Sequence, residues 1–223
     1  MNSFNAFGTR SASFGASVPV WLGTVTPIPV GGTLVSAFVF GGLKISAGAP
    51  IYYDAANKTI RPFCAWEIVS KDTSTHTIVV KANEYGILPK ANDVLAVLGA
   101  SFAASTSAAV VSAIAPTSDE GQYEITFATA GNDTAATVGG FLTYSSDSTA
   151  GTSGKSVAYQ PNGYLYNDIY IEPIAAGVEV ENLAATGAVV QFHAEGVLID
   201  RTPSYPFKEM MKVAVPNVLQ VNG

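Results

Sequence analysis

Short apolar runs separated by glycine- and proline-rich turns recur along this 223-residue chain and constrain its fold most strongly. Gly31-Gly32, Gly41-Gly42 and Gly48-Ala-Pro50 each close one run and open the next. This spacing is typical of short β-strands joined by tight turns. The sequence therefore predicts an all-β fold, a compact barrel or sandwich of short antiparallel strands.

Runs of β-branched and aromatic residues mark the predicted strands. They cover residues 33–40, 43–45, 51–53, 59–63, 77–81, 94–98, 110–115, 123–128, 138–144, 164–171, 178–181 and 189–194. Residues 130–137 and 145–156 are predicted to be long polar surface loops, and residues 206–213 a short C-terminal helix. The predicted organisation is a flexible, extended N-terminal arm over residues 1–17, a β domain over 18–202, and a C-terminal helix and tail over 203–223.

Charged residues make up only 13% of the chain, against about 25% in an ordinary soluble domain. Either hydroxyl groups solvate the surface, or much of the surface is buried in an assembly, because interface cores are poor in charge. The net charge is −6, and the eleven Lys and Arg residues are scattered. We therefore expect no nucleic-acid partner, since phosphates need basic patches.

The first 17 residues carry Phe4, Phe7 and Phe14 among small and polar residues. Such a segment has too little apolar mass to fold alone. Its phenylalanines are either anchors that reach pockets on another surface or part of an unstructured terminus.

Two segments superficially resemble membrane or export signals. Val94–Ser118 is uncharged and long enough to span a bilayer, but Gly99, several serines and the closing Pro116 favour two strands. The first 43 residues lack the basic region that opens a signal peptide. We expect neither a membrane span nor a signal peptide.

Residues that carry chemistry are few. The single cysteine, Cys64, lies in an apolar run and is expected to be a buried, inert thiol. His76 and His193 are too few for a multi-histidine zinc site. Gly154-Lys155-Ser156 ends like a phosphate-binding loop, but Thr149 stands where the first glycine is required. We expect no enzyme activity, no metal site and no cofactor.

Two kinds of acidic site remain open at this point. Glycoside hydrolysis needs only two suitably placed carboxyl groups, and the candidates are Glu67, Glu84, Glu124, Glu172 and Glu195. Asn132-Asp133 and Asn167-Asp168 offer oxygen ligands for calcium, although turns use the same residues and the turn interpretation is preferred.

Two blocks near the C-terminus carry a family resemblance. They are Asn162-Gly-Tyr-Leu-Tyr-Asn-Asp-Ile-Tyr170, and Ala185–Val190 leading to Glu195–Arg201. They resemble the C-terminal half of head fibre proteins of tailed bacteriophages, notably those of Bacteroides and crAss-like phages. Residues 28–53 resemble turns near the start of that family. Residues 207–218 resemble its closing helix, proline and apolar strand.

One region departs from the family pattern. Residues 70–157 are longer and richer in Ala, Ser and Thr than the resemblance leads us to expect, which indicates an inserted or enlarged β region.

The resemblance implies a non-enzymatic capsid decoration protein. It would be made in the host cytoplasm, form a homotrimer and sit on the outer capsid surface of the virion, bound to the major or an auxiliary capsid protein. Its exposed end would meet glycans or another fibre protein. The residues expected to contribute are Phe4, Phe7 and Phe14 as capsid anchors, and Tyr164, Tyr166, Tyr170 and Phe192 in oligomer or core packing.

The competing hypothesis is a carbohydrate-binding β-sandwich that attaches to host glycans. It requires an exposed aromatic platform, drawn from Trp21, Trp66, Tyr164, Tyr166 or Tyr170. Burial of these rings would remove that hypothesis.

Overall fold

Strands make up most of the structure. The computed structural model describes residues 21–22, 32–35, 42–99, 108–145, 157–165, 168–170, 189–190, 192–193, 196–200 and 218–222. Within these ranges the only helix is α2 (Asn132–Ala135), a single turn. The all-β class predicted from the sequence is confirmed.

Six antiparallel strands close into a barrel, in the order β10-β7-β6-β11-β8-β9. These strands are β6 (Ala65–Asp72), β7 (Thr77–Lys81), β8 (Val94–Val97), β9 (Ala108–Pro116), β10 (Gln122–Phe127) and β11 (Phe141–Tyr144). Strands β8, β9 and β10 pair in succession, and β11 returns to lie beside β8, which is a Greek key. Closure leaves these six strands without a free edge.

Alternating residues fill the inside of the barrel. On β7, Ile78 and Val80 are buried while their neighbours are partly exposed, as the period of two along a strand requires. Ile78 lies opposite Ile125 on β10, and Val80 lies opposite Ile68 on β6. Each fully buried side chain of this size contributes about 1.5–3 kcal/mol to folding.

A second sheet, which we call the base, has the order β14-β2-β5-β4-β12-β15. Its strands are β2 (Gly32–Leu34), β4 (Pro50–Asp54), β5 (Thr59–Pro62), β12 (Gly163–Leu165), β14 (Val189–Val190) and β15 (Phe192–His193). Strands β14 and β15 stand at opposite edges, yet a single residue separates them in the chain. Because consecutive Cα atoms are about 3.8 Å apart, the two edges must approach each other, so the base is rolled up.

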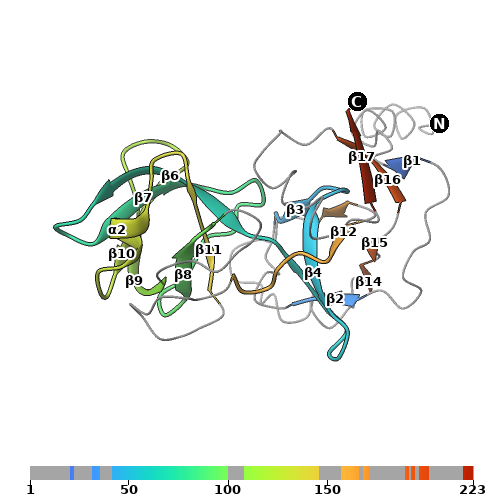
Figure 1. Cartoon of the computed structure of the whole chain (residues 1–223), viewed down its shortest axis with the longest axis horizontal. Helices are drawn as coiled ribbons and strands as arrows, with labels where there is room; N and C mark the ends of the chain where they lie inside the picture. Colours follow the sequence, from blue (N-terminus) through green and yellow to red (C-terminus); the bar gives the residue numbers. More distant parts are fainter. Residues whose placement is uncertain are drawn as a thin grey trace, which may run out of the picture.

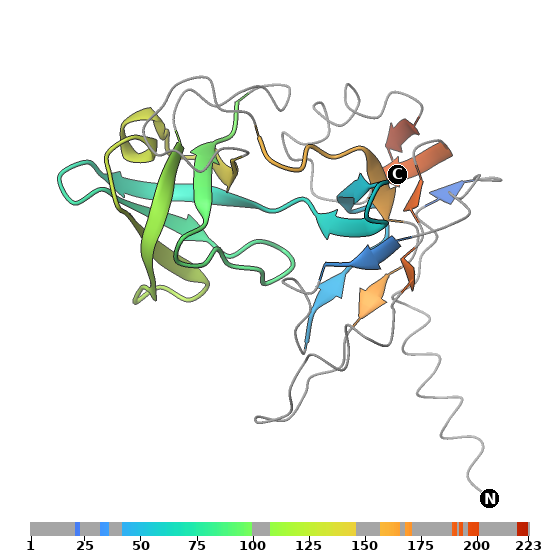
Figure 2. The same cartoon turned by 90° about the horizontal axis from the view of Figure 1, so that it is seen from below.

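The barrel is inserted into the base. The chain leaves the base after β5, builds the whole barrel and returns to the base at β12. The barrel's first and last strands are neighbours, with Ala65 opposite Thr143, and the two parts lie end to end along the longest axis (Figures 1 and 2). Most of the barrel falls in residues 70–157, the region that the sequence analysis set apart.

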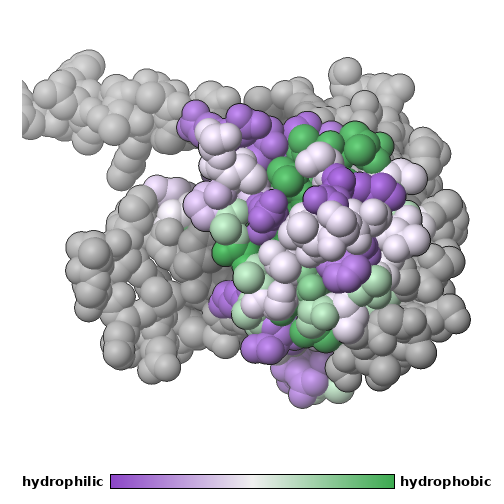
Figure 3. Space-filling view, turned by 90° about the vertical axis from the view of Figure 1, so that its left-hand side faces the viewer, coloured by the Kyte–Doolittle hydropathy of each residue, from purple (hydrophilic) through white to green (hydrophobic). Residues whose placement is uncertain are grey.

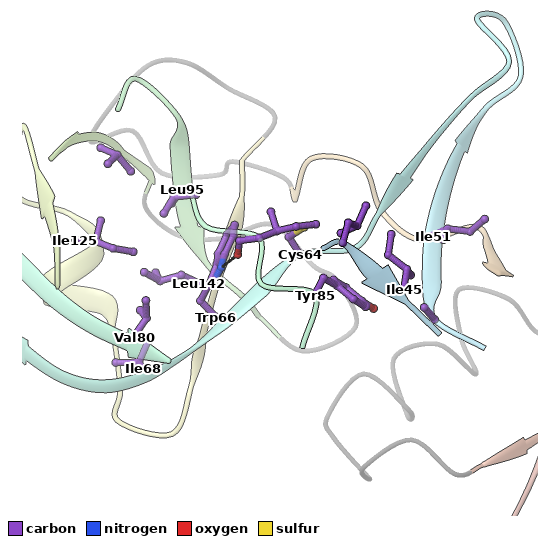
Figure 4. Packing of buried hydrophobic residues seen from close by; sticks show 14 of the residues in the cluster. Ile45, Ile51, Cys64, Trp66, Ile68, Val80, Tyr85, Leu95, Ile125 and Leu142 are labelled. Carbon is purple, nitrogen blue, oxygen red and sulfur yellow. Dashed lines mark hydrogen bonds between the residues drawn. The ribbon is translucent and has the colours of Figure 1, made fainter. Parts of the chain in front are cut away.

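A continuous hydrophobic core runs through both parts. Figure 4 shows Ile45 and Ile51 on the base side and Ile68 on the barrel side, with Trp66 and Tyr85 between them. The Trp66 ring is fully buried, and its Nε1 donates a 2.8 Å hydrogen bond to the carbonyl oxygen of Ile87. The core therefore ties the barrel to the base as well as filling each part.

Two small sheets complete the described structure. Strands β1 (Trp21–Leu22), β16 (Gly196–Asp200) and β17 (Val218–Asn222) form the terminal sheet, which lies at the end of the molecule away from the barrel (Figures 1 and 2). Strands β3 (Lys44–Ile45) and β13 (Ile169–Tyr170) form a two-stranded ribbon.

Three details differ from the sequence prediction. The pairs β2–β5 and β16–β17 are parallel. Strand β6 was not predicted, because residues 60–69 form one apolar run in which the break between β5 and β6 is hard to see. The predicted polar loop 130–137 contains α2, whose Asn132 and Asp133 are buried, because Asn132 Nδ2 donates a 2.8 Å hydrogen bond to the carbonyl of Leu95.

Three predicted elements lie outside the described residues. They are the arm over residues 1–17, the strand over residues 178–181 and the C-terminal helix over residues 206–213. Residues 36–40 of the predicted strand 33–40 and residues 146–156 of the predicted loop 145–156 also lie outside them.

Candidate functional site

Two of the segments that carry the family resemblance, residues 28–53 and 162–170, pair with each other. Strand β12 pairs with β4, with Gly163 opposite Ile51, and β13 pairs with β3, with Ile169 opposite Ile45. Backbone bonds join them further: the N–H of Gly48 donates to the carbonyl of Leu165 over 2.8 Å, and the N–H of Leu165 donates to the carbonyl of Ala49 over 2.9 Å. The motif is thus a long-range seam of the base.

Two polar side chains of the motif complete this seam. Asn162 Oδ1 accepts a 2.8 Å hydrogen bond from the N–H of Tyr53, and Asn162 Nδ2 donates a 2.9 Å bond to the carbonyl of the same residue. Asp168 Oδ1 accepts a 2.7 Å bond from the N–H of Ala47. Asp168 therefore supports the turn that precedes β4, which lies far from Asp168 in the sequence.

The predicted packing residues differ in where the structure places them. Tyr164 is buried, with 3% of its surface exposed. Tyr170 is 60% exposed, so packing in the core of its own chain is wrong for Tyr170, because β13 belongs to a ribbon with one side in solvent. Phe192 lies in β15, opposite Leu165. Tyr166 and the expected anchors Phe4, Phe7 and Phe14 lie outside the described residues.

The aromatic platform of the carbohydrate hypothesis loses two of its rings. Trp66 and Tyr164 are both buried, so neither can stack on a sugar. Tyr170 is the predicted ring that remains exposed among those whose side chains the structure describes.

A partly exposed aromatic cluster that the sequence did not reveal lies on the base. Tyr52 and Arg61 are direct partners across β4 and β5, which puts their side chains on one face. The Arg61 guanidinium carbon lies 4.1 Å from the centroid of the Tyr159 ring, and the Tyr52 and Tyr159 centroids are 5.5 Å apart. Tyr159 has φ of 54°, a left-handed conformation that is unusual for a bulky residue. The cluster joins residues more than 100 positions apart, so sequence spacing gave no signal of it.

A second polar cluster lies where α2 meets the β6–β7 hairpin. His76 Nδ1 and Asp133 Oδ2 are 2.9 Å apart, and Asp133 Oδ1 accepts a 2.8 Å bond from the N–H of Gly131. Lys71 Nζ donates a 2.7 Å bond to the carbonyl of Ala136, just beyond the end of α2. The hairpin therefore contacts both ends of this short helix.

The electrostatics of Asp133 follow from these contacts. Burial raises the pKa of its carboxyl group, but hydrogen bonds from His76 and from the backbone N–H groups of Gly131 and Thr134 outweigh burial and leave the pKa below its ordinary value. A histidine held by a buried carboxylate also occurs in catalytic sites, where a nucleophile completes the arrangement. The sole cysteine cannot fill that position, because Cys64 lies at the barrel–base junction.

The thiol of Cys64 is sheltered. It is 2% exposed, and burial raises the pKa of the thiol far above its ordinary value, with a smaller opposing effect from Asn83. Its Sγ lies 3.6 Å from the carbonyl of Pro62. Since the thiolate is the reactive form, Cys64 is a packing residue.

Three of the five candidate carboxylates lie in the described residues, and all three are surface groups. Glu67 pairs with Lys81 over 2.9 Å on the outside of the barrel, and Glu84 and Glu124 are exposed. Glu172 and Glu195 lie outside the described residues. Within the described ranges, no group of three or more His, Cys, Asp or Glu side chains is placed to hold a metal ion.

The barrel presents a mixed surface at its far end. Figure 3 shows polar residues and small apolar patches interspersed over the described part of this face. Val138, in the turn between α2 and β11, is 68% exposed. No helix in the described part of the chain is long and apolar enough to cross a membrane.

Comparison of the chain with models of known protein families, with curated proteins and with solved structures found no match.

Proposed function

We propose that this protein is a non-enzymatic structural protein of a virion, a head fibre or decoration subunit attached to the capsid. In this role it forms a homotrimer on the outer capsid surface and binds the major or an auxiliary capsid protein. The proposal rests first on the resemblance of residues 28–53 and 162–170 to phage head fibre proteins.

The structural observation that carries the proposal is the seam between those two segments. Asn162 and Asp168 are motif residues, and each uses its side chain to bond the backbone of the other segment, at Tyr53 and Ala47. Side chains that hold two segments together in this way give a motif a distinctive sequence even where it has no catalytic chemistry. The seam therefore supports a structural role for the residues that carry the resemblance.

The arrangement of the parts fits attachment at one end and exposure at the other. The terminal sheet and the barrel lie at opposite ends of the molecule (Figure 1). A base held to a capsid through the terminal sheet would carry the inserted barrel outward, toward glycans or another fibre protein. The 13% content of charged residues suits a chain that buries neutral surface in an assembly.

Gold labelling of intact particles tests this proposal. Antibodies raised against the recombinant protein should label the outside of the capsid, and mass spectrometry of purified particles should find the chain in a copy number divisible by three. Light scattering of the purified chain should give three times the mass of one chain. A monomer at all concentrations, with unlabelled particles, would refute the proposal.

The alternative is a carbohydrate-binding role, which the exposed Tyr170 and the cluster of Tyr52, Arg61 and Tyr159 favour. Tyrosine rings with polar neighbours are suited to stacking on sugars. Arg61 already covers part of the Tyr159 ring, which reduces the area open to a ligand. Glycan-array binding that disappears in Y170A and Y159A would support this alternative.

A further inference from the structure

Asn162 is followed by Gly163, the neighbour that most favours spontaneous deamidation of an asparagine. In that reaction the backbone nitrogen of the following residue attacks the side-chain amide carbon, and glycine has no Cβ to hinder the approach. Asn162 is exposed, so the water that completes the reaction can reach it. The same amide holds the seam of the base through its two bonds to Tyr53. The reaction and the seam therefore compete for one side chain.

The native bonds hold the reacting groups of Asn162 and Gly163 in place. Both polar atoms of the Asn162 amide bond the backbone of Tyr53, so the amide is directed toward β4. The N–H of Asn162 donates a 3.0 Å bond to the carbonyl of Ile51, and Gly163 lies opposite Ile51 in β12. Attack requires rotation of the side chain and of the backbone that follows it, which these bonds resist. The closed seam should therefore slow the reaction, and local opening should release it.

We propose that Asn162–Gly163 is a deamidation site that the closed seam protects, so that the chain is modified only in copies whose base has opened. The Gly163 nitrogen loses its proton to water and bonds to Cγ of Asn162, the bond from Cγ to Nδ2 breaks, and ammonia leaves with a proton from water. A second step adds water to either carbonyl of the succinimide ring, which yields aspartate or isoaspartate. This inference goes beyond the proposed function and does not depend on it.

Both products disfavour closing of the seam. An aspartate at this position sets a carboxylate oxygen against the carbonyl of Tyr53, where the amide nitrogen donated a hydrogen bond. An isoaspartate adds a methylene to the main chain immediately before β12, which disturbs the pairing of β12 with β4. The modification therefore records that the base has opened and makes it harder to close again.

Peptide mapping by mass spectrometry tests the proposal on the full chain. The protein is incubated at neutral pH, either folded or unfolded in urea, and aspartate and isoaspartate at position 162 are measured against time. The unfolded chain should accumulate both products. The folded protein should do so at least about tenfold more slowly, because the reaction then has to wait for an opening that costs free energy.

Variants at Asp168 separate opening of the seam from unfolding of the whole chain. Asp168→Ala removes the 2.7 Å bond to the N–H of Ala47 and leaves the reacting groups unchanged, so the folded protein should deamidate about tenfold faster or more. Asp168→Asn keeps an acceptor and should accelerate the reaction less. Asp133→Asn removes a contact in the barrel instead and should leave the rate close to that of wild type. Circular dichroism checks that each variant is folded.

A second measurement serves if Asp168→Ala does not fold. Urea well below the unfolding midpoint should open the seam of the wild-type protein and raise the rate in the same way.

Three outcomes would overturn the inference. An unfolded chain that stays unmodified would show that Asn162 is not a deamidation site. A folded protein that reacts as fast as the unfolded chain would show that the seam gives no protection. Equal rates in Asp168→Ala and Asp133→Asn would show that the modification does not depend on opening of the seam.

Discussion

The side-chain amide of Asn162 bonds both backbone polar groups of Tyr53, accepting from its N–H at 2.8 Å and donating to its carbonyl at 2.9 Å. The amide thus takes the place of one residue of a neighbouring strand. It continues the pairing of β4 beyond Gly163, where β12 begins. This side chain therefore adds two hydrogen bonds to the backbone pairing that sets the register between segments 109 positions apart in the chain.

Removing this amide should destabilise the protein. Asn162→Ala loses two hydrogen bonds and is expected to lower the free energy of unfolding by about 1–3 kcal/mol. Asn162→Asp keeps the acceptor for the Tyr53 N–H but sets a carboxylate oxygen against the Tyr53 carbonyl, so its loss at neutral pH should be at least as large. Urea unfolding followed by circular dichroism measures both. Equal stability of wild type and N162A would contradict the role of the seam.

Tyr159 should show a backbone effect that depends on the replacement. Tyr159→Ala loses the contacts with Tyr52 and Arg61 and keeps the left-handed backbone, so a loss of about 1–2 kcal/mol is expected. Tyr159→Gly loses the same contacts but relieves the backbone, and should be more stable than Y159A by about 1 kcal/mol. Thermal and urea unfolding measure the difference. If Y159A proves the more stable of the two, the left-handed conformation is not what Tyr159 adopts in solution.

The contact between His76 and Asp133 should make stability depend on pH on the acid side. The pKa of Asp133 is lowered in the folded protein, so its stabilising contribution is complete above the pKa of the unfolded chain and is lost as the pH falls through the folded value. Wild type and Asp133→Asn should therefore differ most near neutral pH, and the difference should shrink below about pH 4. Urea midpoints measured from pH 7 to pH 3 test this, and a difference that is constant with pH would contradict it.

The barrel should fold without the base. Its six strands pair with one another in a closed circuit, and its first and last strands are neighbours through Ala65 and Thr143. A fragment of residues 64–145 should give a β-type circular dichroism spectrum and one cooperative thermal transition. The reciprocal variant, in which a short Gly-Ser linker replaces the barrel, tests whether the base closes by itself. A fragment that unfolds without cooperativity would mean that the shared core around Trp66 is required.

Local pattern was enough to locate most strands. Residues 77–81 were predicted from alternating branched residues and are β7, with the same bounds. The uncharged stretch from Val94 was divided correctly into two strands, β8 and β9, because serines and a glycine interrupt it. The apolar surroundings of Cys64 correctly indicated its burial. The alternation of side chains along a strand and the residues that form a turn both involve only a few consecutive positions, so a single sequence is enough to recognise them.

The candidate sites were less accessible from the sequence. The Asn162–Asp168 block was recognised by resemblance, but its partners at Tyr53 and Ala47 were not predicted. Asp133 was assigned to a polar loop, whereas the hairpin contact with His76 and the bond from Gly131 bury it. The cluster around Tyr159 was not predicted from the sequence, because its members come from three separate segments.

By itself, then, the sequence determined the β class, the positions of most strands and the few residues available for chemistry. Only the tertiary structure decided that β6 to β11 close into one barrel, that this barrel interrupts the base, and that Asn162 meets Tyr53. The physical reason is that the alternation of apolar and polar residues predicts which side chains of a strand face inward, but not which strand lies beside it. Every strand offers the same backbone N–H and C=O groups, so hydrogen bonding alone does not select which strands pair. The pairing depends on how the buried side chains of all the strands pack together.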